Sequence, residues 1–165
     1  MIGHSTRTIE DFIDILKYYD IDEVVDVRTI TGSRRNPQYN AENLQKSLEK
    51  AGIIYKHIKE LGGLRKAQND SVNLGWENLS FRGYADYMQT TEFEQGLSEL
   101  QMEIAKHTVA IMCAEAVPWR CHRRLIGDAL LIRGYKVVDI FEKGEVRDHE
   151  LTPFAKVDGC RIIYP

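Results

Sequence analysis

Residues 108–142 read TVAIMCAEAVPWRCHRRLIGDALLIRGYKVVDIFE, and this segment indicates the architecture of the chain. Its first part, 108–113, is an apolar run typical of a buried strand. After a polar link, residues 125–132 place apolar side chains at spacings of three and four, the period of a helix, until Gly134 ends it. The run 136–141 predicts a second strand. The segment is therefore a strand, loop, helix and strand unit, with its reactive side chains where α/β proteins bind ligands.

The rest of the chain alternates strands and helices in the same way. Thr8 is placed to cap a helix with apolar residues on one face. The patterns predict helices at about 9–19, 42–51, 81–88 and 93–105, strands at 23–28, 53–58 and 161–164, and a long loop at 65–82. Strands alternating with helices imply a three-layer α/β sandwich on a mainly parallel central sheet. The length of 165 residues favours a single α/β domain over residues 1–165.

The charge of the chain gives only a local indication of a partner. The net charge is −3 and 28% of the residues are charged, so nothing global demands a polyanion. Between Arg28 and Lys66, however, nine Lys or Arg face three Asp or Glu. That region is suited to an anionic ligand, unless its charges are simply scattered over a solvated surface.

The cysteines and the N-terminal residues indicate where the protein works. Three cysteines are an odd number without framework spacing, which argues for a reducing compartment. Residues 1–5 lack the basic region and apolar core of a targeting signal, and no run approaches the length of a membrane span. We therefore expect a cytoplasmic protein without a membrane partner. The sequence leaves the oligomeric state open.

Unusual polar residues come from four separate segments of the chain. In a parallel sheet the carboxyl ends of the strands share one edge, so these segments should converge there. They are His4 and Ser5, Arg28 to Arg35, Glu60 to Arg65, and Cys113 to Arg123. Convergence of this kind predicts a ligand pocket more strongly than any one short motif does.

Cys113 is the natural candidate nucleophile of such a pocket. A thiol between the end of a strand and the start of a helix faces N–H groups that favour its thiolate. His4 or His122 would then transfer protons, and Glu115 has the position of an acid or base. The alternatives are a buried structural cysteine that finishes the strand, a histidine bonded to the backbone, and an ordinary solvated glutamate.

Ligand binding is expected from arginines and one aromatic side chain. Guanidinium groups clamp phosphate or carboxylate in bidentate fashion, and aromatic rings stack on bases. The candidate ligand-binding residues are Ser5, Arg28, Arg34, Arg35, Arg65, Tyr84 and Arg123. Pairing of these arginines with loop acids, and burial of Tyr84 in the core, are the alternative interpretations.

These residues leave three classes of function open. One is an anion-binding, cysteine-dependent enzyme acting on a phosphate-bearing or other anionic small molecule. Another is a noncatalytic nucleotide or nucleic-acid binding module. The third is a metal-dependent hydrolase or redox protein that uses Cys113, Cys121 and His122, although the spacing is not that of a CxxC pair. We expect no cofactor and no metal.

Several short motifs resemble one family over nearly the whole chain. They are Gly3-His4-Ser5, Val25-Asp26-Val27-Arg28, Ser33-Arg34-Arg35-Asn36-Pro37, Leu61-Gly62-Gly63, Gly83-Tyr84-Ala85, Cys113-Ala114-Glu115, Cys121-His122-Arg123 and the closing segment 149–155. Together they resemble the bacterial and archaeal domain-of-unknown-function family 488. Because that family has no assigned role, the resemblance implies no particular activity.

A more distant likeness covers about half of the chain. Val25-Asp26-Val27-Arg28, a strand that ends in Cys113, and the later segment 134–137 resemble the layout of rhodanese-like sulfurtransferases. That resemblance implies a loop cysteine in a cradle of backbone N–H groups. The related phosphatases carry arginine six residues after the cysteine, where this chain has Trp119. The likeness therefore supports topology better than activity.

Overall fold

The computed structural model describes residues 1–165 and is built on a six-stranded sheet with the strand order β3-β2-β4-β1-β5-β6. The first five strands in this order are parallel, and β6 runs antiparallel to β5. The elements are β1 (Ile2–Gly3), α1 (Ile9–Tyr18), β2 (Glu23–Asp26), α2 (Ala41–Lys50), β3 (Ile54–His57), α3 (Leu79–Tyr87), α4 (Thr91–Ile104), β4 (Val109–Cys113), α5 (Arg123–Leu131), β5 (Val138–Glu142), β6 (Glu145–Asp148), β7 (Lys156–Asp158) and β8 (Arg161–Ile163). This arrangement confirms the predicted α/β sandwich with a mainly parallel central sheet.

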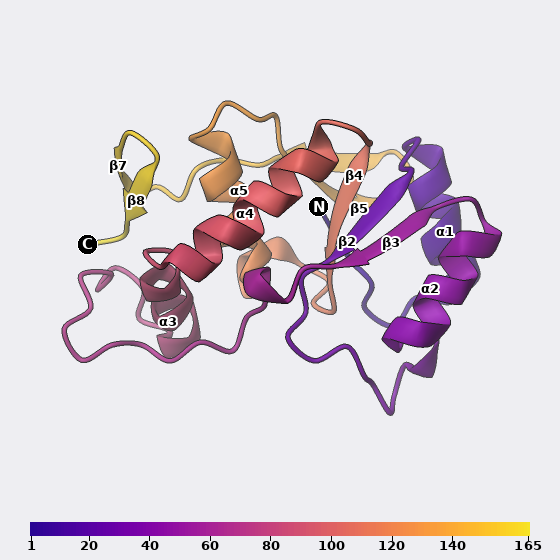
Figure 1. Ribbon diagram of the computed structural model, residues 1–165, viewed down its shortest axis with the longest axis horizontal. Coiled ribbons are helices and arrows are strands. Elements are labelled where there is room, and N and C mark those ends of the chain that lie inside the picture. Colours follow the sequence, from indigo (N-terminus) through magenta and orange to yellow (C-terminus); the bar gives the residue numbers. More distant parts are fainter.

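Helices cover the sheet on both faces (Figure 1). On one face, α1 and α2 bury a core that includes Phe12, Leu16 and Leu44. On the other face, α3, α4 and α5 bury a larger core with Leu97 and Leu125. In β2 and β4, alternate residues point into opposite cores, which is the expected period of two for a strand covered on both sides.

The helices begin and end where their sequence signals predict. Thr8 caps α1 by accepting a hydrogen bond from the backbone N–H of Asp11 at 3.1 Å. Asn78 and Thr90 cap α3 and α4 in the same way. The predicted boundaries of α2, α3 and α4 lie within two residues of the observed ones. None of the helices is both long and apolar enough to cross a membrane.

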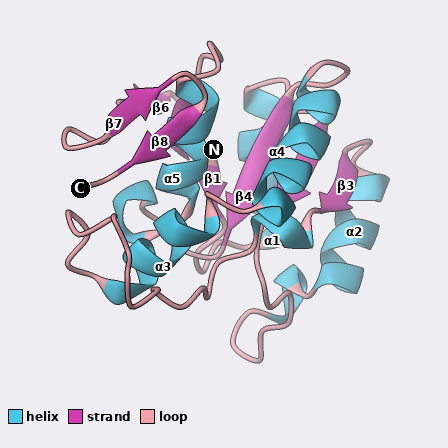
Figure 2. Cartoon of the chain, turned by 60° about the vertical axis from the view of Figure 1, so that its left-hand side comes forward, coloured by secondary structure: helices cyan, strands magenta, loops and turns pink.

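Two strands, β6 and β7, were missed by the sequence prediction. All residues of both strands are exposed, so neither strand shows the apolar pattern that identifies a buried strand. Each belongs to a hairpin whose turn contains a glycine with positive φ, Gly144 at 74° and Gly159 at 59°. The predicted strand at 161–164 is β8, which pairs only with β7 in a small sheet away from the central one (Figure 2).

The long loop before α3 is fastened by one buried carboxylate. Asp86 accepts hydrogen bonds from Gln68 N–H at 2.8 Å, Ser71 Oγ at 2.6 Å and Asn73 Nδ2 at 2.8 Å. Asn73 in turn accepts a hydrogen bond from the backbone of Tyr164 at 2.9 Å. The loop is thus tied both to α3 and to the C-terminal segment.

Candidate functional site

The direction in which the chain leaves the sheet changes between β1 and β4. From β1 it crosses through α1 to β2, and from β4 it crosses through α5, on the other face, to β5. In open α/β sheets such a switch point leaves a crevice at the carboxyl ends of the strands. Here the crevice is a pocket of about 420 Å³. Its lining residues are His4, Ser5, Thr6, Arg28, Ile30, Gly32, Ser33, Asn36, Ala114, Glu115 and Ala116.

The loops after β1 and β4 approach each other closely at this pocket. His4 N–H donates to the Cys113 carbonyl at 2.9 Å, and Ser5 N–H donates to the Ala114 carbonyl at 3.0 Å. A Cβ atom on Gly3 would lie only 1.9 Å from the carbonyl oxygen of Glu115. The pairing of the two loops therefore requires glycine at position 3.

A buried ion pair forms one wall of the pocket, on the α1 and α2 face of the sheet. Arg28 donates from Nε to Asp26 Oδ1 at 2.9 Å and from Nη2 to Asp26 Oδ2 at 2.7 Å. Tyr55 donates to the same carboxylate at 2.8 Å, and the Tyr39 carbonyl accepts from Arg28 at 2.8 Å. The arginine is thus neutralised and held rigidly, with only Nη1 directed elsewhere.

His4 is the residue that Arg28 Nη1 faces. Its Nδ1 lies 2.8 Å from the Ser5 carbonyl, so Nδ1 carries the proton and Nε2 faces Arg28 Nη1 at 3.4 Å. The ring stacks on Tyr39 with a centroid distance of 4.0 Å. Burial lowers the pKa of His4 to about 4, and the Arg28 guanidinium acts in the same direction. His4 is therefore a neutral hydrogen-bond acceptor at pH 7.

A second cluster lies on the opposite face, around the sulfur of Cys121. Arg123 donates to this sulfur twice, from its backbone N–H at 3.5 Å and from Nε at 3.4 Å. The guanidinium also donates to the Glu115 carbonyl, and none of its hydrogen bonds reaches a carboxylate. Arg123 is 1% exposed. A buried guanidinium that lacks a carboxylate needs another anion, and the Cys121 thiolate is in position to supply it.

Cys113 is the partner of that thiolate. The sulfur atoms of Cys113 and Cys121 and the ring nitrogen of His122 lie within 4.8 Å of one another. Hydrogen bonding from Cys113, followed by His122 and Arg123, lowers the pKa of Cys121 against the effect of burial. The same interaction, together with burial, raises the pKa of Cys113. These interactions favour a thiolate on Cys121 over one on Cys113, the cysteine to which the sequence directed attention.

His122 is oriented by the backbone on two sides. Its Nε2 lies 2.9 Å from the Val27 carbonyl and donates to it, and its Nδ1 lies 3.7 Å from Cys121 Sγ, where it stabilises a thiolate only when it also carries a proton. A Cβ atom on Gly63 would lie 2.9 Å from Nδ1 of His122, so the segment after β3 closes over the imidazole only with glycine there. Tyr84 packs on the ring at a centroid distance of 4.9 Å.

The structure brings together most of the predicted site residues. His4, Ser5, Arg28 and Glu115 line the pocket, and Cys113, His122 and Arg123 belong to the sulfur cluster, which is connected to the pocket by the hydrogen bond from Arg123 to the Glu115 carbonyl. The participation of Tyr39 and Tyr55 was not predicted. Nothing in the sequence marks them, because Tyr55 meets Asp26 only through the pairing of β3 with β2, and Tyr39 meets Arg28 only through the folding of the turn before α2.

Four predicted residues lie elsewhere or face away. Arg34 and Arg35 are exposed on the loop after β2 and do not line the pocket. Arg65 lies over the ring of Tyr87 at 3.7 Å and lines a different pocket. Tyr84 is 1% exposed and donates to the Leu61 carbonyl at 2.8 Å, so its ring belongs to the core and has no free face for a base.

The sulfur cluster also has the composition of a metal site. Two thiol sulfurs and one imidazole nitrogen within 4.8 Å are a ligand set suited to zinc or iron. The Val27 carbonyl orients His122 as outer-shell acceptors orient metal-binding histidines. Arg123 argues against a metal, because its positively charged guanidinium already donates a hydrogen bond to the sulfur of Cys121, which a metal would bind.

One comparison with known proteins identifies a family. Residues 8–130 match the family model described as "Domain of unknown function DUF488", which covers more than half of the chain. No curated protein and no solved structure matches the chain. The likeness to rhodanese-like domains therefore stays a prediction.

Proposed function

The chain belongs to the DUF488 family, whose description names no reaction, and we propose from the site itself that it is a cysteine-dependent enzyme that uses Cys121 on a small anionic substrate. The observation that carries the proposal is the buried Arg123 guanidinium, which donates to Cys121 Sγ at 3.4 Å and to no carboxylate. A thiolate held in this way is a nucleophile at neutral pH. The role expected of Cys113 passes to Cys121.

Cys113 has a complementary role in this proposal. When the Cys121 sulfur bonds to an electrophilic atom of the substrate, the leaving group takes the proton of Cys113. The negative charge then moves from one sulfur to the other and remains in the same cluster with Arg123. The cluster carries the same total charge before and after the step. The cost of holding a charge in its low-dielectric surroundings therefore changes little.

The pocket at the switch point supplies the binding site. Its volume of about 420 Å³ suits a small molecule better than a nucleic-acid strand. Ala114 to Ala116 line it, and the Glu115 carbonyl in the same segment accepts from Arg123. An anionic group that replaces this carbonyl on Arg123 would bring the substrate beside the sulfur. Arg28 Nη1 and Ser5 are the other donors at the pocket.

The proposal is tested by the ultraviolet absorbance of the thiolate, measured against pH in the full-length protein. The wild type should absorb as a thiolate well below the ordinary cysteine pKa of about 8.5, and Cys121→Ser should lose this signal. Cys113→Ser should raise the pKa of the remaining thiolate, because its hydrogen bond is weakened. Cys160→Ser is the matched control, since Cys160 is exposed and away from the cluster.

Mass spectrometry then tests the covalent step. Small phosphoryl and sulfur electrophiles should leave an adduct on Cys121 in the wild type and none in Cys121→Ser. If all three thiols titrate at or above the ordinary value, Cys121 is not an activated nucleophile and the proposal fails.

A metal site is the second candidate for the same residues, favoured by the oriented imidazole of His122. Zinc bound by Cys113, Cys121 and His122 would abolish the thiol titration and release protons on binding. Gentle purification followed by metal analysis separates the two: a stoichiometric metal that is lost in Cys121→Ser supports the metal site instead.

A further inference from the structure

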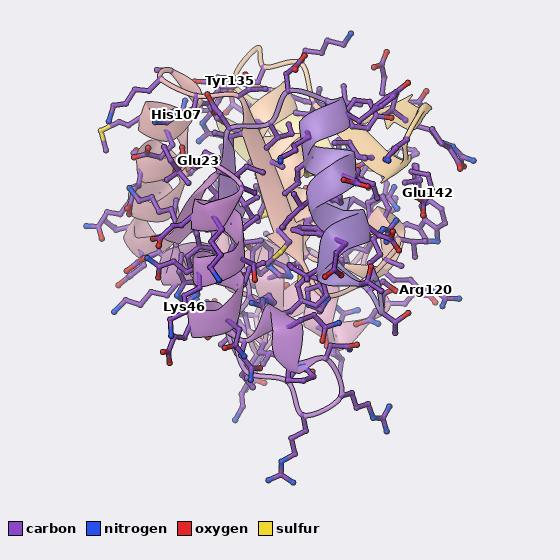
Figure 3. The ribbon with its side chains drawn as sticks, turned by 90° about the vertical axis from the view of Figure 1, so that its right-hand side faces the viewer. Glu23, Lys46, His107, Arg120, Tyr135 and Glu142 are labelled. Atoms are coloured by element: carbon purple, nitrogen blue, oxygen red, sulfur yellow. The ribbon has the colours of Figure 1, made fainter.

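A separate group of titratable side chains lies at the opposite edge of the sheet, where the strands begin. Glu23 is the first residue of β2, Glu103 lies in the last turn of α4, and His107 lies in the link from α4 to β4. Figure 3 shows Glu23 and His107 close together at the upper left of the view, and Arg120, from the loop that follows β4, lower down on the right-hand side. This group is therefore independent of the proposed function.

The buried carboxylate of Glu23 receives no hydrogen bond from a donor group. The side chain is 1% exposed, and neither Oε1 nor Oε2 accepts a hydrogen bond, whereas a proton on Glu23 would be shared with Glu103. Burial, and then the nearby charge of Glu103, raise the pKa of Glu23. A buried carboxylate without a hydrogen bond destabilises the folded protein by more free energy than an ordinary surface contact contributes. We therefore expect a proton or a cation to lie between the oxygens of Glu23 and the neighbouring side chains.

His107 is already oriented toward the same point. Its Nδ1 lies 3.5 Å from Asp22 Oδ1, and its Nε2 lies 3.9 Å from Glu23 Oε2. Asp22 is itself fixed, because it accepts from Thr108 N–H at 2.9 Å. A carboxylate on one ring nitrogen, with the other nitrogen free, is the arrangement that orients metal-binding histidines.

Glu103 completes the group. One of its oxygens forms an ion pair with Lys56 at 2.8 Å, which leaves the other oxygen available. One ligand atom from each of Glu23, Glu103 and His107 lies within 4.8 Å of the other two. Glu103 is only 13% exposed in its side chain, so solvent reaches the group from one side.

We propose that Glu23, Glu103 and His107 form a binding site for a divalent cation, with Zn²⁺ as the best match to two carboxylates and one imidazole. Three protein ligands with a fourth position open to solvent is the usual composition of an accessible zinc site. The charge of the cation satisfies Glu23, and Asp22 holds the imidazole of His107. The competing arrangement is a single proton shared between Glu23 and Glu103.

Calorimetric titration with Zn²⁺ tests this proposal. The protein should carry Cys113→Ser and Cys121→Ser and be treated with a chelator first, so that the sulfur cluster cannot bind the ion. One equivalent should bind, and Glu23→Gln or His107→Asn should weaken binding about tenfold or more. The control is Glu99→Gln, which removes a carboxylate that pairs with Lys56 at 2.8 Å but is not among the three ligands.

Cobalt gives an independent readout. Co²⁺ in this site should show weak visible bands without the intense sulfur-to-metal absorption of a thiolate complex. Thermal unfolding checks that each variant folds. If Glu23→Gln does not fold, His107→Asn provides a second variant, because the side chain of His107 is 26% exposed. No Zn²⁺ binding by the double-serine protein, or binding that both variants leave unchanged, would overturn the proposal in favour of the shared proton.

Discussion

Replacing Arg123 with methionine should raise the pKa of Cys121 by several units. At the observed Nε to Sγ distance of 3.4 Å, unit charges in a medium with an effective dielectric constant of about 20 attract by about 5 kcal/mol. Since about 1.4 kcal/mol corresponds to one pKa unit, the full effect is about 3.5 units. Entry of water into the space left by the guanidinium reduces this to roughly 2 units.

The assay is the ultraviolet titration of the thiolate, with folding checked by urea denaturation at each pH. Arg123→Lys retains the positive charge but loses the planar guanidinium, which donates to both the sulfur and the Glu115 carbonyl. The pKa of Cys121 should therefore rise less than in Arg123→Met. Arg124→Met is the matched control, because Arg124 donates to Thr152 Oγ1 at 3.1 Å and does not contact the sulfur. A rise below about half a unit in Arg123→Met would refute the argument that this guanidinium holds the thiolate.

The remaining predictions concern stability. Although burial opposes it, Asp128 and Asp139 raise the pKa of His149 from 6.5 to about 9, so its stabilising charge is fully present below pH 6.5 and is lost as the pH rises through 9. Urea unfolding between these pH values should show a loss of about 2 kcal/mol that His149→Gln abolishes, and equal pH slopes in both proteins would contradict this. Asp128→Asn should cost about 3 kcal/mol at pH 7, measured by the same unfolding experiment, because it breaks a fully buried pair; a cost near zero would show that the pair is not stabilising. Gly3→Ala should cost about 3 kcal/mol or displace the Glu115 loop, seen as a lower melting temperature, since its Cβ overlaps backbone; an unchanged melting temperature would count against the close approach.

Much of the fold could be predicted because its strong elements carry their own signals. Helix α1 has the Thr8 cap and an apolar face, β4 is an apolar run, and β2 has two valines at its centre and is buried between the two layers. The order of the strands could not be predicted, since β1 has only two residues and its place between β4 and β5 depends on long-range pairing. The exposed strands β6 and β7 lack any burial pattern.

The candidate site was predictable in location but not in the roles of its residues. Convergence at the carboxyl ends of parallel strands follows from topology, and His4, Arg28 and Cys113 do lie at that edge. The preference for Cys121 over Cys113 depends on which sulfur a buried arginine contacts. That contact joins the turn before α5 to the first residue of the helix, where no periodic pattern in the sequence shows it.

Charge compensation distinguishes the structural clusters from the functional candidates. The pair of Asp26 with Arg28 is buried and matched in charge and hydrogen bonds, and such a pair needs nothing further. His149 likewise lies within 3.1 Å of a carboxylate oxygen on each of its two sides. Arg123 and Glu23 are equally buried but lack a charged side-chain partner that satisfies them. An unmatched charge costs several kcal/mol, so the folded protein tolerates it only where another group, ion or proton completes it. In our two proposals this group is a thiolate for Arg123 and a cation for Glu23, one at each edge of the sheet.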